Sequence, residues 1–142
     1  MTRWVVDASV AVKCLIREVH TDEARRLLST ATEVIAPDLL WPEVGSAVWK
    51  RLRRGELSQD EAAYLVDGLD RLRIVAYSGA PIMRPALRIA VHHDRSFYDS
   101  LYLALAAEVG YPLVTADRKF HEAIKRGPLA GHILWIEDAA SA

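Results

Sequence analysis

Short apolar runs that alternate with longer helical stretches are the feature that most restricts the fold of this chain. Each run has the length of a buried strand, and a segment with helical periodicity or a helix-capping residue follows it. Strands that alternate with helices in this way form a parallel sheet with both faces covered. The sequence therefore predicts an α/β fold, with strands at residues 4–6, 34–36, 74–76, 113–115 and 133–136.

Capping residues place the helix boundaries between these strands. Ser58 and Glu61 have the spacing of a capping box at a helix start, and Gly55 and Gly110 are typical residues just beyond a helix end. No repeat, low-complexity segment or linker interrupts the pattern, so we expect one α/β domain. The expected helices cover about residues 9–16, 38–54, 80–92, 96–108 and 117–125, and two more begin at residues 21 and 58.

Charge and cysteine content exclude several classes of protein. The formal net charge of −1 argues against nonspecific binding of nucleic acid over a wide basic face, so any such contact must come from a local patch. Cys14 is the single cysteine, which excludes an intramolecular disulfide and fits a reducing compartment. Asp7 and Lys13 interrupt the N-terminal apolar stretch, unlike a signal peptide. We expect a cytoplasmic protein that does not contact a membrane.

Two carboxylates follow expected strands. Asp7 comes directly after the first strand, and Asp117 lies just past residues 113–115. Ligand sites of open α/β sheets lie outside the carboxyl ends of the strands, so both acids are candidates for a binding site. Each can also be explained as the N-cap of the helix that follows it.

Two further carboxylates border apolar segments. Asp99 precedes residues 101–107, which predict a helix buried on all sides, and an unpaired carboxylate is costly there. The alternative is a capping box that Asp99 forms with Ser96. Glu43 lies within the mostly apolar residues 39–44, and its alternative role is that of a first-turn acid favoured by the helix dipole.

The four acids together indicate a metal site if they converge. Their mutual repulsion would then require protonation or a divalent cation. Carboxylate oxygens without a Cys/His set at zinc-like spacing suit Mg²⁺ or Mn²⁺. Such a cation can activate water and stabilise charge that develops on a phosphate, so hydrolysis of a phosphodiester is the expected chemistry.

Four segments resemble, in order, the acidic motifs of PIN-domain nucleases, and in particular of VapC-like toxins from toxin–antitoxin pairs. They are residues 5–11, 42–44, 98–106 and 115–120, and the third is the most specific. Together they extend over most of the chain. The resemblance implies a three-layer α/β/α domain over residues 1–142, with a central parallel sheet.

The resemblance also implies an activity and its residues. Asp7, Glu43, Asp99 and Asp117 would hold Mg²⁺ or Mn²⁺ in an endoribonuclease. The hydroxyls of Ser9 and Thr115 would orient carboxylates or bound waters. Many relatives have Asn three residues after the second acid, where this chain has the shorter Ser46, so a role for Ser46 is doubtful. The implied partners are RNA, a co-expressed antitoxin and a second copy of the chain.

Basic and aromatic residues complete the candidates. Trp41 and Trp49 lie eight residues apart on one helix, which suits either core packing or a surface for a partner. A basic run near the end of the same helix either complements the helix dipole or steers RNA phosphates. The candidate RNA contacts are Lys50, Arg51, Arg53, Arg54 and Lys119.

Two alternative functions remain. A phosphatase of the haloacid dehalogenase type also has an Asp after its first strand, but it needs a second Asp two residues later, where this chain has Ser9. The other alternative is a catalytically degenerate PIN-like scaffold or binding module whose acids only cap helices. Convergence of the four carboxylates would distinguish an enzyme from such a scaffold.

Overall fold

The fold is built on one sheet of five parallel strands. The computed structural model describes residues 2–142 and orders the strands β3-β2-β1-β4-β5. All five expected strands are present, and each observed boundary lies within one residue of the expected one. The strands are β1 (Arg3–Val6), β2 (Glu33–Pro37), β3 (Val75–Tyr77), β4 (Leu113–Thr115) and β5 (Ile133–Trp135).

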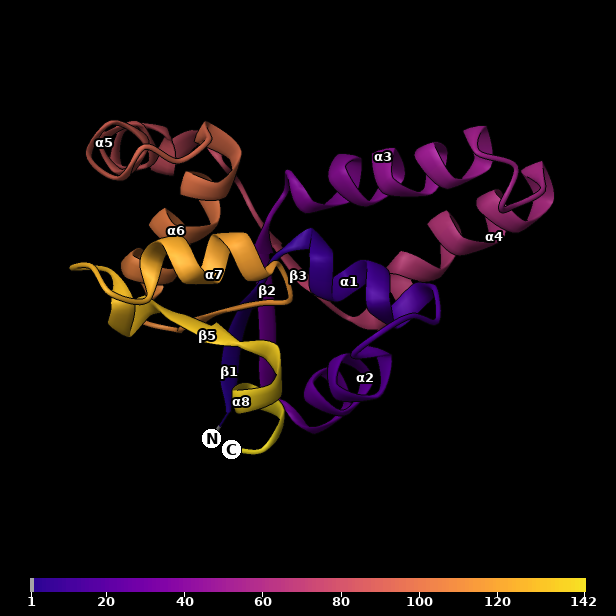
Figure 1. The fold of residues 1–142 in the computed structure, drawn as a ribbon, viewed down its shortest axis with the longest axis horizontal. Coiled ribbons are helices and arrows are strands. Elements are labelled where there is room, and N and C mark those ends of the chain that lie inside the picture. The colour runs from indigo at the N-terminus through magenta and orange to yellow at the C-terminus, as the bar shows by residue number, and fades with distance from the viewer. Residues whose placement is uncertain (1) are drawn as a thin grey trace.

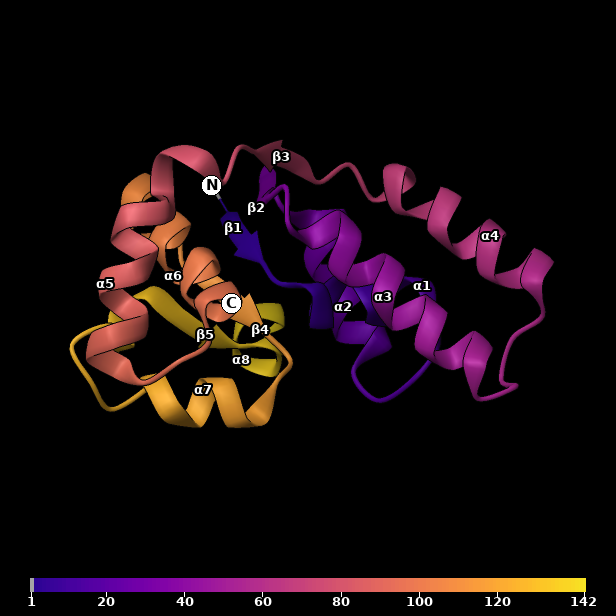
Figure 2. The ribbon, with the colours of Figure 1, turned by 90° about the horizontal axis from the view of Figure 1, so that it is seen from above.

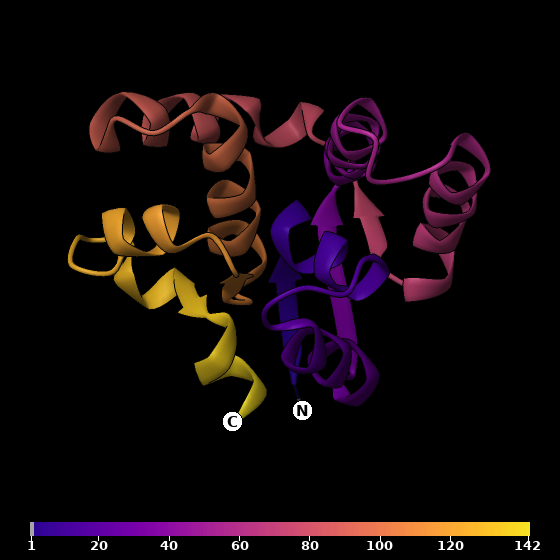
Figure 3. The same cartoon turned by 45° about the vertical axis from the view of Figure 1, so that its right-hand side comes forward.

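Helices cover both faces of the sheet, as the sequence predicts. On one face α6 (Phe97–Val109) and α7 (Arg118–Ile124) pack, and on the other α1 (Ala8–Leu15) and α8 (Ile136–Ala140) pack (Figure 3). The arrangement is therefore α/β/α. The other helices are α2 (Thr21–Thr30), α3 (Leu40–Arg53), α4 (Gln59–Gly68) and α5 (Met83–His93), with 3₁₀ turns η1 (Leu69–Leu72), η2 (Ala80–Ile82) and η3 (Ala130–His132).

Two helical groups extend beyond the sheet. The α3–α4 pair projects to one side and α5 lies on the other (Figures 1 and 2). Both α3 and α5 follow strands, so both begin near the carboxyl edge of the sheet. The carboxyl edge of the sheet therefore lies between the α3–α4 pair and α5. Among residues 2–142, no helix is long and apolar enough to cross a membrane.

The expected helix over residues 80–92 is divided in the structure. Its first part is the 3₁₀ turn η2, and the α-helix α5 begins only at Met83. Pro85 explains the division, because it has no N–H to donate to the carbonyl of Pro81 in a continuous α-helix. The predicted buried helix after Asp99 is present as α6, in which residues 100–106 are buried.

The sheet reverses its direction of growth between β1 and β4. From β1 the chain moves to β2 and β3 on one side, and it then returns to add β4 and β5 on the other side. Val6 is paired with Val114. The residues that follow this pair, Asp7 just after β1 and Thr115 at the end of β4, consequently meet at the reversal point, where open α/β sheets commonly bind ligands.

Candidate active site

Asp7 is a buried carboxylate held by two hydroxyl groups. It is 6% exposed at the end of β1. The Ser9 hydroxyl donates to Oδ1 at 2.5 Å, and the Thr115 hydroxyl donates to Oδ2 at 2.5 Å. Burial raises the pKa of Asp7 to about 6, against the hydrogen bonds from Ser9 and Thr115, and the nearby Asp117 raises it further. The charged form of Asp7 is thus stabilised by hydroxyls but not neutralised.

Glu43 is held from across the site by a tyrosine. It lies in the first turn of α3, and the Tyr102 hydroxyl of α6 donates to its Oε1 at 2.6 Å. Partial burial raises the pKa of Glu43, the Tyr102 hydrogen bond opposes this shift, and Asp99 adds to it. This contact joins two helices whose residues are far apart in the sequence, and it sets the direction of the Glu43 carboxylate.

Asp99 and Asp117 lie at the starts of α6 and α7. The backbone N–H of Asp99 donates to Ser96 Oγ at 3.0 Å, while the Asp99 carboxylate pairs with Arg95, with Nη2–Oδ2 at 2.8 Å. Asp117 is exposed, and its Oδ1 accepts the backbone N–H of Phe120 at 3.2 Å. Helix capping therefore accounts for one oxygen of Asp117, but the Asp99 carboxylate does not act as a cap.

The four carboxylates form two interacting pairs that Tyr102 links. Asp7 is close enough to Asp117, and Glu43 to Asp99, for each pair to interact electrostatically. Tyr102 is almost fully buried, and its pKa is strongly raised by that burial and then by its contact with Glu43, with smaller contributions from Asp7 and Asp99. Within residues 2–142, no group of three or more His, Cys, Asp or Glu is already arranged to hold a metal ion.

The donor set nevertheless fits a hard divalent cation. Asp7 is buried without a cationic partner in the described part of the chain, and a carboxylate in that position is costly unless a cation compensates its charge. Carboxylate oxygens with hydroxyls behind them are the ligands that Mg²⁺ and Mn²⁺ prefer. The protein itself holds the acids by hydroxyls, by Tyr102 and by Arg95.

A groove of about 640 Å³ begins beside Glu43 and runs along α3. Three of the five predicted RNA-contacting residues, Lys50, Arg51 and Arg54, line it, whereas Arg53 and Lys119 do not. Arg51 also pairs with Glu18, and Arg54 pairs with Glu56 at 2.7 Å. The other lining residues are Val12, Leu39, Pro42, Ser46, Ala47 and the exposed Tyr98.

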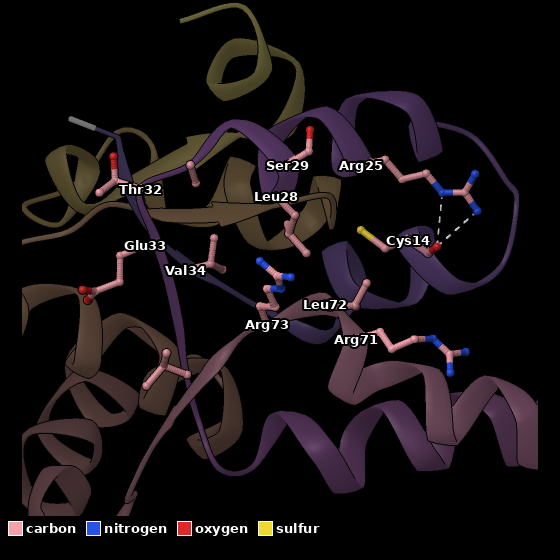
Figure 4. A pocket seen from close by; sticks show the side chains of 12 residues that line it. Cys14, Arg25, Leu28, Ser29, Thr32, Glu33, Val34, Arg71, Leu72 and Arg73 are labelled. Atoms are coloured by element: carbon pink, nitrogen blue, oxygen red, sulfur yellow. Dashed lines mark hydrogen bonds between the residues drawn. The ribbon is translucent and has the colours of Figure 1, made fainter.

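A more spacious cavity, of about 880 Å³, lies away from the acids and is lined by residues of α2, β2 and η1 (Figure 4). Its lining includes Arg25, Arg71 and Arg73. Arg25 donates to the carbonyl of Cys14, and Figure 4 shows the three guanidinium groups spread along the cavity rather than directed at one point. This arrangement does not form a site for one anion.

Sequence reasoning missed two residues that contact the acids, Tyr102 and Arg95. Arg95 lies just before α6 and precedes Asp99 by four residues, a spacing at which two side chains near a helix start can form an ion pair. That signal was available in the sequence. The sequence contains no comparable signal for Tyr102, because its contact with Glu43 depends on how α3 and α6 pack.

Comparison with known proteins places this chain in a family. Residues 4–125 match the PIN domain. The chain belongs to the PIN-domain family. It is 35% identical over 122 residues to ribonuclease VapC3 of Pyrobaculum aerophilum, and the match covers 84% of this chain and 93% of that protein. The family resemblance seen in the sequence is therefore confirmed.

Solved structures show the same fold in other members. PAE2754 from Pyrobaculum aerophilum has a TM-score of 0.75 at 25% identity, with 99% of this chain and 88% of that chain covered. VapC20 from Mycobacterium tuberculosis, a toxin that cleaves the sarcin–ricin loop, has a TM-score of 0.66 at 18% identity, covering 84% and 94%. VapBC2 from Rickettsia felis, bound to a DNA fragment from its promoter, has a TM-score of 0.66 at 14% identity, covering 94% and 97%.

Proposed function

We propose that this protein is a divalent-cation-dependent endoribonuclease and that it acts in the cytoplasm as the toxin of a toxin–antitoxin pair. The observation that carries the proposal is Asp7, which is buried at the reversal point of the sheet with Asp117 beside it and with no cationic side chain paired to it among residues 2–142. Membership of the PIN-domain family, and a 35% identical relative named a ribonuclease, support RNA as the substrate.

In this proposal Asp7, Glu43, Asp99 and Asp117 hold Mg²⁺ or Mn²⁺. The bound cation supplies an activated water and neutralises charge on the phosphate. Ser9 and Thr115 fix the direction of Asp7, because each donates to a different oxygen of its carboxylate. Glu43, held by Tyr102 and with a raised pKa, is placed to accept a proton from the attacking water.

The groove along α3 is proposed as the path of the RNA strand. Glu43 lies at its start, and Lys50, Arg51 and Arg54 lie along it, so a phosphate chain that leaves the acids meets positive charge. Lys50 makes no ion pair with any described residue, and it is therefore available for a phosphate. Such a local patch reconciles RNA binding with the net charge of −1.

An antitoxin and a second copy of the chain are the proposed protein partners. A ribonuclease in its own cytoplasm requires restraint, and a structural neighbour is the VapBC2 assembly. Trp49 is 55% exposed on α3, whereas Trp41 packs against the core, so Trp49 is the proposed antitoxin contact. For the homodimer, α5 presents an exposed apolar stripe at four-residue spacing, formed by Met83, Leu87 and Val91.

The alternative, a degenerate scaffold, is favoured by one observation. Asp7 and Asp117 do accept backbone N–H groups at the starts of α1 and α7. Capping does not explain why Glu43 is bound by Tyr102 or why Asp7 is buried beside a second carboxylate. The nuclease function accounts for all four acids.

Cleavage of an RNA pool by the purified protein tests the function. We expect cleavage with Mg²⁺ or Mn²⁺, loss of cleavage in EDTA, and recovery when excess cation is added. The Asp99→Asn variant, purified in the same way, controls for a contaminating nuclease and should be inactive. Full cleavage in EDTA would refute the metal mechanism, and a fully active Asp99→Asn variant would refute the assignment of the site.

A further inference from the structure

Arg95 is the basic residue that pairs with the acid cluster. Of the ion pairs formed by residues 2–142, the Arg95–Asp99 pair is the one that includes any of the four carboxylates. Arg95 lies in the turn between α5 and α6, directly after Asp94, whose φ of 49° gives a left-handed backbone. The turn thus places a guanidinium beside Asp99, and both side chains are partly buried.

An aromatic ring holds the guanidinium group of Arg95 in place. Its central carbon lies 5.3 Å from the centroid of the Phe120 ring, a distance at which a cation is attracted to an aromatic face. Phe120 is buried, and its backbone N–H donates to Asp117. Arg95 therefore lies between α6, which carries Asp99, and the start of α7, which carries Asp117.

Most of the hydrogen-bonding capacity of Arg95 is directed at no protein group. A guanidinium has five N–H groups in a planar fork that matches carboxylate and phosphate oxygens. One nitrogen, Nη2, bonds to Asp99, whereas Nε is buried and has no hydrogen-bond partner among residues 2–142.

Binding of a cation changes what Arg95 can pair with. A divalent cation held by Asp99 would compete with the guanidinium for the same oxygens and would place two positive charges beside it. A phosphate that reaches the cation brings the negative charge that restores the balance. Arg95 lies beside Asp99 with its guanidinium partly exposed, so its remaining N–H groups can turn toward that phosphate.

We propose that Arg95 binds a nonbridging oxygen of the scissile phosphate when RNA and cation are bound, and that it rests on Asp99 when they are absent. The inference rests on the proposed ribonuclease function. It adds a catalytic residue of positive charge to a site that otherwise consists of acids and hydroxyls. Arg95 stabilises negative charge as it develops on the phosphate, and it exchanges no proton or bond.

The test compares Arg95→Met with Arg95→Lys, using Arg26→Met on α2 as the control for loss of one exposed positive charge. Mn²⁺ affinity is measured by titration calorimetry without RNA. Values of kcat and KM are measured on a defined RNA oligonucleotide at saturating Mn²⁺. Thermal melting verifies that each variant is folded.

We expect Arg95→Met to bind Mn²⁺ about tenfold more tightly, because a competing charged hydrogen bond is removed. Its kcat should nevertheless fall about 10²–10³-fold, as when one preorganised donor to a transition state is lost. Arg95→Lys should recover part of kcat, because it keeps the charge but not the fork. Arg26→Met should match the wild type in all three quantities.

The inference requires that Arg95→Met changes Mn²⁺ affinity and kcat in opposite directions. Tighter Mn²⁺ binding with an unchanged or higher kcat would show that Arg95 is only a counter-ion, and the inference would be wrong. If Arg95→Met does not fold, a wild-type kcat in Arg95→Lys would equally overturn it. If the wild type itself shows no Mn²⁺-dependent cleavage, the proposed function fails and the inference fails with it.

Discussion

At the scale of single residues, Asp7 has the environment that departs most from that of an ordinary surface acid. Burial raises its pKa to about 6, while Ser9 and Thr115 counteract only part of that shift. The metal-free folded chain therefore binds a proton at Asp7 more tightly than the unfolded chain does. The resulting stabilisation is complete below about pH 4, near the ordinary value of 3.8, and is lost as pH rises through 6.

We predict that Asp7→Asn abolishes cleavage and stabilises the metal-free protein at pH 7, by about 1–3 kcal/mol. The melting temperature of the metal-free wild type should fall between pH 4 and 7, and the variant should lack the part of this fall that Asp7 causes. Thermal melts in EDTA at several pH values measure both effects. Asp67→Asn, which changes an exposed acid on α4, is the control.

A variant that melts below the wild type at pH 7 would contradict this prediction. It would mean that the bond from the Val10 N–H to Asp7 matters more than the cost of burying the charge. The same raised pKa implies that Mn²⁺ affinity should weaken below about pH 6, because Asp7 must lose its proton to bind a cation.

At the scale of elements, α3 joins the chemistry to the proposed RNA path. Glu43 lies in its first turn, while Lys50, Arg51 and Arg54 lie near its end, on the same groove. One helix therefore carries both an acid of the site and the basic patch. Its position relative to α6 is fixed in part by the bond from Tyr102 to Glu43.

We predict that Lys50→Ala raises the KM for RNA about three- to tenfold and leaves kcat nearly unchanged, because a contact with a distant phosphate contributes to binding but not to the reacting centre. The salt dependence of RNA binding should also become less steep. Arg53→Ala is the matched control, because it removes a positive charge from the same helix outside the groove. Equal effects of the two variants would argue against the groove as the RNA path.

The sequence predicted those features that depend on local pattern and on sheet topology. The strand boundaries follow from the apolar runs, and the places of Asp7 and Asp117 follow from the rule that sites lie at strand ends. The contact of Thr115 with a carboxylate was implied only by the family resemblance. The bond from Tyr102 to Glu43 could not be predicted, because it depends on the packing of α6 against α3. The sequence also could not show that Lys50 lines the groove whereas Arg53 does not, because this depends on the three-dimensional course of the groove.

At the scale of the whole molecule, the acidic edge of the sheet lies between the α3–α4 pair and α5 (Figures 1 and 2). Both helical groups carry exposed apolar side chains, Trp49 on α3 and the Met83–Leu87–Val91 stripe on α5. Partner proteins can therefore approach from either side of the site. A partner protein bound to α3 or α5 can therefore restrict access to the acids without any change in the sheet.

We predict that expression of this chain alone arrests cell growth and that co-expression of the antitoxin from the adjacent gene restores it. Trp49→Ala should weaken this rescue more than it weakens RNA cleavage, because loss of an exposed aromatic side chain reduces binding of a partner. Growth curves of cells with toxin alone and with toxin plus antitoxin measure the effect. Asp99→Asn is the inactive control, and harmless expression of folded wild-type protein would count against the toxin role.

The hydroxyls that hold Asp7 are themselves held by the backbone. Ser9 Oγ accepts the N–H of Ala116 at 3.0 Å, and Thr115 Oγ1 accepts the N–H of Asp117 at 3.0 Å, so the single proton of each hydroxyl points to Asp7. Asp7 is thereby anchored to the ends of two paired strands through both of its carboxylate oxygens, whereas Glu43 is held by Tyr102 and Asp99 by Arg95, one side chain each. Asp7 is therefore the acid of the site whose position the sheet itself fixes.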